Sequence, residues 1–189
     1  MTMKHSLLIG GFLLFLFSCA TTNRIIEIED SFKEIKGIKL AQNLKAYSSE
    51  QTESFGNRKY YDLKVNYLFQ QFKKGQTILI AEFQITTPVG VGEPDSILFL
   101  NLDQEKIRLI STEYKYNGKL MTRKFVIPEN LWVSIANSQK IMYRLYEGKE
   151  GVDVKLKASE TAKVKEFFRQ AIKRRDANLP PVPEGQKKW

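Results

Sequence analysis

Apolar and polar residues alternate along several segments with the period of two that marks a β-strand. Residues 61–69 and 79–86 each place apolar side chains on one face, and a turn at 73–76 separates them. Together these segments predict an antiparallel hairpin. The run 97–102 is continuously apolar and short, which is typical of a strand buried on both faces.

The second half of the chain repeats the pattern. Residues 107–116 and 120–127 flank Asn117 and Gly118, two residue types that tolerate the positive φ of a tight turn, so a second hairpin is predicted there. Residues 141–156 predict a third hairpin, whose second strand has the cleanest alternation in the sequence. The chain is therefore expected to be rich in antiparallel sheet.

Two segments have the spacing of a helix instead. After Pro128, the apolar residues of 131–135 predict a short helix or a packed loop that covers one end of the core. A longer helix is predicted with Ser159 as its N-cap and Glu160 in its first turn, where the helix dipole favours an acid. Its apolar face consists of Val164, Phe167, Phe168, Ala171 and Ile172.

The remaining segments are less regular. Residues 25–40 mix strand and helix periods, whereas 48–57 and 88–94 have the composition of loops. About seven strands and one amphipathic helix predict a mainly β (α+β) fold, an antiparallel β-sandwich or curled sheet with a C-terminal helix, and the sandwich is favoured. A single β-rich domain is expected over 24–176, followed by a disordered proline-rich tail at 177–189.

The N-terminus has the organisation of a signal peptide. Lys4 and His5 precede an apolar run of 11 residues at 7–17, and the small residue Ser18 follows. Because a membrane-spanning helix needs about 20 apolar residues, this run is too short for a permanent span. Residues 1–18 are therefore predicted to be removed on export.

The end of this leader resembles the lipobox of bacterial lipoproteins, carried by Leu16, Phe17, Ser18 and Cys19. The resemblance implies cleavage before Cys19 and a thioether-linked diacylglycerol on its sulfur, often with a third fatty-acyl chain such as palmitate on the new amine. Phe17 is bulkier than enteric lipoboxes usually carry and is more similar to those of spirochaetes or the Bacteroides group. Two alternatives remain open: an ordinary secretory signal, and a short uncleaved anchor.

The resemblance also implies a location and a partner. Residues 19–23 would form a lipidated tether, and several acyl chains would bind the membrane almost permanently, because each buried methylene contributes about 0.8 kcal/mol. No aspartate follows Cys19, which in enteric bacteria directs a lipoprotein to the outer membrane. The expected location is therefore the bacterial cell envelope, at the outer membrane, either periplasmic or exposed at the surface.

The sequence restricts the available chemistry. His5 is the only histidine and Cys19 the only cysteine, so a mature chain would have neither an imidazole nor a free thiol. Nucleophile–histidine pairs, thiolate zinc sites and redox dithiols are thereby excluded. No catalytic residue, metal ligand or cofactor is predicted. Two acidic groups, 27–30 and 103–105, are expected to be solvated.

The charge of the mature chain is basic. Of 30 lysines and arginines the leader removes one, which leaves a net charge of about +8 against 21 acids. Lys173, Arg174 and Arg175 at the end of the predicted helix are candidates for binding an anionic envelope or host polymer. The alternative is a solvated helix end whose cations complement the dipole. Nucleic acid is not an expected partner in this compartment, and no oligomeric state is predicted.

These observations predict a lipid-anchored envelope protein that acts as a binding or structural module without catalysis. The alternative is a carboxylate-dependent envelope hydrolase acting on glycan or lipid. Such an enzyme needs two acids about 5 to 10 Å apart in a cleft.

Overall fold

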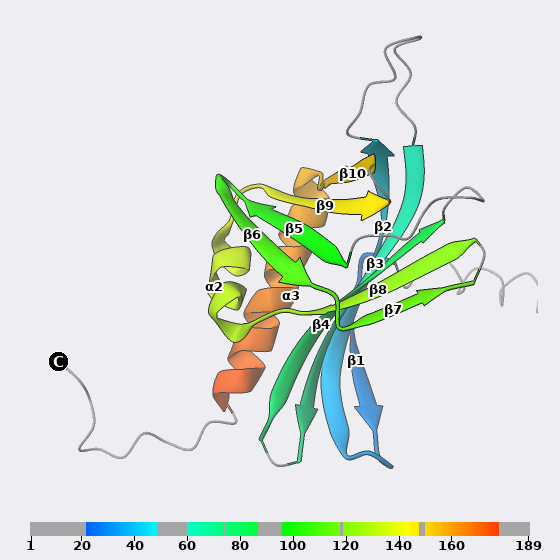
Figure 1. Cartoon of the computed structure of the whole chain (residues 1–189). Helices are drawn as coiled ribbons and strands as arrows, with labels where there is room; N and C mark the ends of the chain where they lie inside the picture. The colour runs from blue at the N-terminus through cyan, green and yellow to red at the C-terminus, as the bar shows by residue number, and fades with distance from the viewer. Residues whose placement is uncertain are drawn as a thin grey trace, which may run out of the picture.

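The computed structural model describes residues 22–48, 60–73, 75–86, 96–117, 119–147 and 150–177. These residues form one strongly curled antiparallel sheet, with two helices packed against its inner face (Figure 1). The predicted mainly β class with a C-terminal helix is confirmed. Of the two predicted forms, the curled sheet describes this fold, because all the named strands belong to a single sheet.

The strands are β1 (Ile25–Asp30), β2 (Ile35–Ser48), β3 (Tyr60–Phe72), β4 (Thr77–Thr86), β5 (Ile97–Leu102), β6 (Glu105–Ile110), β7 (Glu113–Tyr116), β8 (Leu120–Val126), β9 (Ile141–Glu147) and β10 (Glu150–Lys155). The helices are α2 (Glu129–Asn137) and α3 (Ala158–Ala177). The spatial order is β6-β5-β9-β10-β2-β3-β4-β8-β7, and β1 also pairs with β2.

Strand β2 determines the shape of the sheet because two strands share one of its edges. β1 pairs with β2 over residues 35–40, whereas β10 reaches only the far end of β2, at 47–48. The other edge of β2 pairs with β3 over almost its whole length. With β10 and β1 at opposite ends of one edge, the sheet folds around α3 (Figure 1).

The ambiguous segment 25–40 is resolved as two strands, β1 and the start of β2, around a turn at 31–34. The prediction of a single strand over 107–116 is wrong. At Ser111 and Thr112 the chain leaves one strand and enters another: Ser111 N donates to Ser96 O (2.7 Å), and Thr112 N donates to Lys124 O (2.8 Å). β6 therefore pairs with β5, and β7 pairs with β8.

The other predicted hairpins are confirmed, with two differences in detail. β5 buries Leu98, Leu100 and Leu102, but its other face is only half-buried, so burial on both faces is wrong. The long helix begins at Ala158, two residues before the start that a Ser159 cap would give. Instead of a Ser159 cap, the carboxylate of Glu160 accepts a hydrogen bond from Lys157 N (2.7 Å), which satisfies a free N–H before the first turn.

The core lies between the curled sheet and the helices. The predicted apolar face of α3 is buried except for Ile172, which is half-buried, and Tyr67 of β3 contacts the rings of Phe167 and Phe168. Across the core, the hydroxyls of Tyr67 and Tyr143 form a 2.7 Å hydrogen bond. The short predicted helix is confirmed as α2, where Trp132 is 1% exposed and its indole N–H donates to Ile127 O (2.9 Å).

Several sequence predictions lie largely outside the described residues. These are the leader 1–18, most of the tether 19–23, the loop 88–94 and the tail beyond Ala177. Of the loop predicted at 48–57, only Ser48 is described, and it ends β2. Within the described ranges, neither helix has the length and apolar character that a membrane span requires.

Candidate functional site

The described chain begins three residues after the predicted lipid site. Cys19 itself lies outside the described residues, so its acylation stays a prediction. Thr22 forms a parallel bridge to Ala41 of β2, and Asn23 N donates to Ala41 O (2.6 Å). Asn23 has a φ of 62°, a left-handed conformation that asparagine adopts more readily than most residues. The chain thus joins the domain at the edge of β2.

A buried glutamine ties this entry point to α3. Gln42 is 1% exposed, and its Nε2 donates both to Asn23 Oδ1 (2.9 Å) and to Glu160 O (3.1 Å). Thr22 and Asn23, expected to belong to the tether, are therefore held against the folded domain. Only Ala20 and Thr21 separate Cys19 from it, and an extended chain of this length spans about 10 Å.

The opposite end of β1 presents an aromatic ring to solvent. Asp30 Oδ1 accepts hydrogen bonds from Phe32 N and Lys33 N (both 3.1 Å), which stabilise the turn between β1 and β2. Phe32 itself is 99% exposed. The sequence predicted Phe32 as one member of a mixed apolar pattern. The available signal was Asp30 two residues before it, since aspartate commonly bonds the backbone of such a turn.

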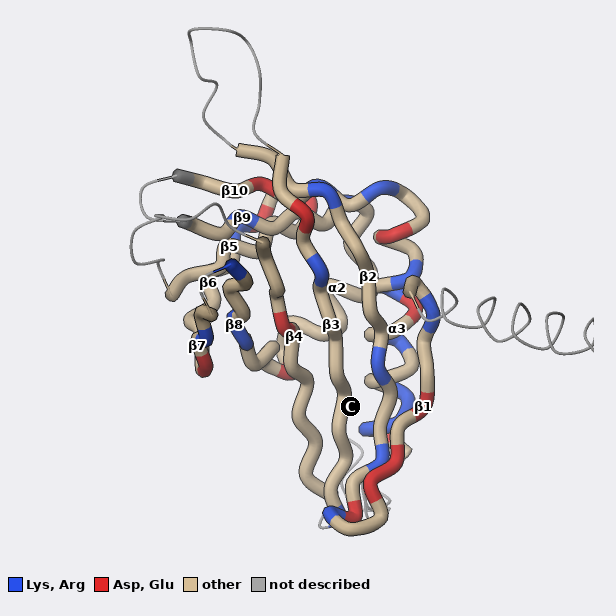
Figure 2. Tube along the Cα trace, turned by 90° about the vertical axis from the view of Figure 1, so that its right-hand side faces the viewer, with Lys and Arg blue, Asp and Glu red and all other residues tan. Residues whose placement is uncertain are grey.

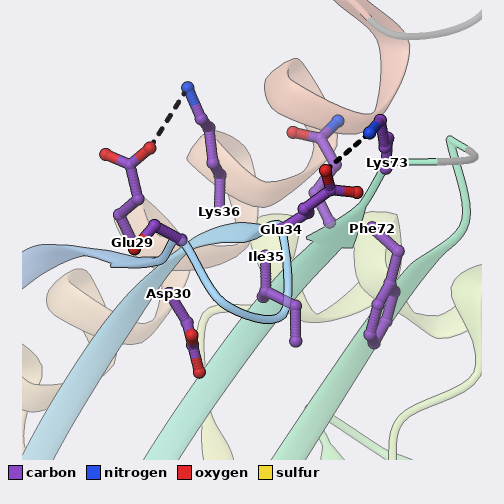
Figure 3. A pocket seen from close by; sticks show the side chains of 9 residues that line it. Glu29, Asp30, Glu34, Ile35, Lys36, Phe72 and Lys73 are labelled. Atoms are coloured by element: carbon purple, nitrogen blue, oxygen red, sulfur yellow. Dashed lines mark hydrogen bonds and ion pairs between the residues drawn. The ribbon is translucent and has the colours of Figure 1, made fainter.

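A hollow of about 460 Å³ lies at the end of the β1–β2 and β3–β4 hairpins (Figure 3). Its charged groups are largely paired with one another. Lys36 Nζ lies 3.5 Å from Glu29, and Lys73 Nζ donates to Glu34 at 2.5 Å. Ile35 and Phe72 supply the apolar part of the lining.

Two of the three acids that line this hollow, Glu29 and Asp30, do not face one another. Glu29 and Asp30 are consecutive residues of β1, so their side chains project from opposite faces of the sheet. Figure 3 shows Glu29 beside Lys36 on one side of the sheet and Asp30 on the other. Glu29 and Asp30 therefore do not form the facing carboxyl pair that the hydrolase alternative requires.

A second hollow, of about 290 Å³, lies on the face of β5, β9 and β10 that points away from the core. Its acid, Asp153, is 7% exposed and accepts two hydrogen bonds from Arg144, at 2.5 and 2.7 Å. The hydrogen bond to Asp153 is the main reason that the pKa of Arg144 is raised. Both carboxylate oxygens of Asp153 therefore accept hydrogen bonds from the Arg144 guanidinium.

The three predicted polyanion-binding residues have different surroundings. Arg174 donates to Glu27 of β1 (2.5 Å). Arg175 lies 5.5 Å from the ring of Trp132 and donates to Asp176 (2.9 Å). Lys173 is exposed and borders a groove between α2 and α3. The structure therefore does not gather the three charges into one patch, and polyanion binding stays a prediction.

Asp103, from the acidic group at 103–105, has a structural role. Asp103 Oδ1 accepts from Gln139 N (3.0 Å) and Lys140 N (2.8 Å), which joins the β5–β6 turn to the start of β9. Among the described residues, no group of three or more histidine, cysteine or acidic side chains is arranged to hold a metal ion.

Comparison of the chain with family models, with curated proteins and with solved structures found no match.

Proposed function

We propose that this chain is a lipoprotein of the bacterial envelope, held in the membrane by acyl chains on Cys19, and that its β-rich domain is a binding or structural module without catalytic activity. The leader and the lipobox resemblance support the anchor. The restricted residue chemistry supports a role that does not depend on catalysis.

The entry of the chain at Thr22 carries the proposal. Thr22 is exposed and lies at the edge of β2, three residues after Cys19. Cleavage before Cys19 would leave the hydrogen bonds that join Asn23 to Ala41, and Gln42 to Asn23 and Glu160, in place, because these residues all follow Cys19 in the chain. An acylated Cys19 can therefore reach a bilayer while the domain keeps its fold.

The described acids support the non-catalytic part. Asp153 is held by Arg144, Asp103 bonds the backbone of a neighbouring segment, and Asp30 stabilises a turn. A general acid or base needs an oxygen within hydrogen-bond reach of its substrate, whereas both oxygens of Asp153 already accept hydrogen bonds from Arg144. These acids contribute to the fold.

Mass spectrometry of the native N-terminal peptide tests the anchor directly. The expected result is a peptide that begins at Cys19 and carries diacylglycerol. A Cys19→Ser variant is expected to leave the membrane fraction as a folded soluble protein.

Ser18→Ala is the matched control, because it keeps a small residue before the cleavage site and leaves Cys19 intact. It is expected to stay acylated and membrane-bound. An unmodified Cys19, or a Cys19→Ser variant that remains in the membrane through an uncleaved leader, would contradict the proposed anchor. Turnover of envelope glycans or lipids by the purified protein would contradict the non-catalytic role.

A further inference from the structure

The β1–β2 hairpin holds a fully exposed aromatic ring in an ordered turn. Phe32 is 99% exposed, although β1 and β2 pair in register up to Asp30 and Ile35 on either side of it. Hydrogen bonds to Asp30 Oδ1 hold the backbone of Phe32 and Lys33. The ring leaves apolar surface in contact with water, so the position favours an apolar contact outside the domain.

Strand β1 connects this ring to the entry point of the chain. Thr22 bridges to Ala41 beside the start of β1, and Phe32 follows the other end of the strand, so the six residues of β1 separate the two by about 20 Å. Within the described residues, β1 pairs only with β2, so its other edge lies at the outside of the sheet. Figure 2 shows β1 along one side of the molecule, with β7 on the opposite side.

The exposed groups along this edge suit a bilayer surface. Arg24 is exposed near Thr22, and Ile26 is 39% exposed. The side chain of Lys33 beside Phe32 is 74% exposed and lies 4.0 Å from the carboxylate of Asp30. The neighbouring acids Glu27 and Glu29 have cationic partners, Arg174 and Lys36, within the domain. Cations that flank apolar side chains can reach phosphates while the apolar groups enter the headgroup region.

Resting on the proposed acylation of Cys19, we infer that the outer edge of β1 lies along the phospholipid bilayer and that Phe32 inserts into it as a second contact. The acyl chains hold one end of β1 through a link of two residues, and Phe32 holds the other end. Two contacts about 20 Å apart, the length of the six-residue strand, prevent the domain from pivoting on its anchor. The edge that bears β7 then faces away from the membrane.

Fluorescence quenching on the acylated protein tests this orientation. A dye is attached either at Ser31→Cys, beside Phe32, or at Lys119→Cys, an exposed position in the β7–β8 turn. Acylated Cys19, the only native cysteine, does not react. The protein is reconstituted into phosphatidylethanolamine–phosphatidylglycerol vesicles that contain a doxyl-labelled phospholipid. Quenching at position 31 is expected to exceed that at 119 by about threefold or more.

Substitution of Phe32 separates insertion from simple proximity. Phe32→Ala is expected to remove most of the extra quenching at position 31, while flotation with the vesicles is unchanged because the acyl chains remain. Phe32→Leu, which keeps an apolar side chain, is expected to retain most of it. Equal quenching at the two positions, stronger quenching at 119, or no effect of Phe32→Ala would overturn the inference.

Two outcomes distinguish this inference from the proposed function. A protein that is acylated and floats, yet shows no quenching at position 31, overturns the membrane contact of Phe32 and leaves the anchor intact. A protein that lacks acyl chains overturns both, because the link that places β1 near lipid is then absent. Shielding of position 31 only when envelope proteins are added would assign Phe32 to a protein partner and also overturn the inference.

Discussion

The buried hydrogen bond between Tyr67 and Tyr143 allows a sharp test of the core. The two tyrosines are 2% and 5% exposed, and their hydroxyls lie 2.7 Å apart. A Tyr→Phe change removes one oxygen and keeps the ring. The edge contacts of Tyr67 with Phe167 and Phe168 can therefore persist in the variant.

The expected cost follows from what each variant leaves unpaired. Tyr143→Phe leaves the Tyr67 hydroxyl buried without its partner, which costs about 1 to 3 kcal/mol of the free energy of unfolding. Tyr67→Phe in turn leaves the Tyr143 hydroxyl without its partner, at a similar cost. In the double variant no hydroxyl remains, so its stability should lie within about 1 kcal/mol of the unsubstituted protein.

Urea denaturation followed by circular dichroism measures these free energies, and thermal unfolding gives a second reading. At about 2 to 4 °C per kcal/mol for a chain of this size, each single variant should lower Tm by roughly 2 to 12 °C. Tyr60→Phe is the matched control, because Tyr60 is 73% exposed and its change should stay within about 0.5 kcal/mol. If the double variant lost the sum of the two single effects, the hydroxyls would not be coupled.

The same pair predicts a dependence on alkaline pH. Burial, the largest cause, raises the pKa of both Tyr67 and Tyr143 above the ordinary value of 10.0. Above pH 10 the unfolded chain loses these protons while the folded chain keeps them. Stability therefore decreases as pH rises from 10 toward the folded-state values. In the double variant this part of the decrease should disappear.

Two further predictions concern the backbone and the surface. Gly37→Ala should destabilise the domain by about 1 to 3 kcal/mol in urea denaturation, since the new Cβ would overlap the carbonyl oxygen of Phe69 on β3; unchanged stability would contradict this packing. Hydrogen bonds from Lys115, and secondarily from Lys124, lower the pKa of Glu113 to about 2, so Lys115→Gln should raise it toward 4.5 in an NMR titration. The stabilisation from Glu113 should be present above pH 4.5 and lost as pH falls toward 2, and an unchanged midpoint would refute the contact.

Much of the candidate site could not be predicted from the sequence, because its contacts join residues that are far apart in the chain. The charge of Arg174 suggested a polyanion site, but Glu27, 147 positions earlier in the chain, accepts its hydrogen bond. The ring of Trp132 lies beside Arg175 in the same way, from a different helix. These partners come into contact only when β1, α2 and α3 pack together, so no local sequence pattern indicates the contacts.

The strands show the same difference between what local periodicity predicts and what the packing of distant segments decides. The alternation in 61–69 and 79–86 determines β3 and β4, because a period of two places one face in the core whatever the neighbouring strands are. The apolar face of α3 is likewise local, set by the spacing around Val164. For 107–116, periodicity identified extended chain but not the change of partner at Ser111, which depends on where β5 and β8 lie in space.

The sequence by itself determined the mainly β class and the long C-terminal helix, because each rests on residues close together in the chain. The leader and the lipid site at Cys19, which rest on the sequence alone, stay predictions. The tertiary structure alone decided the curl around β2, the attachment of Asn23 through Gln42, and the exposure of Phe32. An apolar residue is equally compatible with a core and with an exposed turn until long-range packing sets its surroundings. That packing placed the entry point and the exposed ring at the two ends of one edge strand.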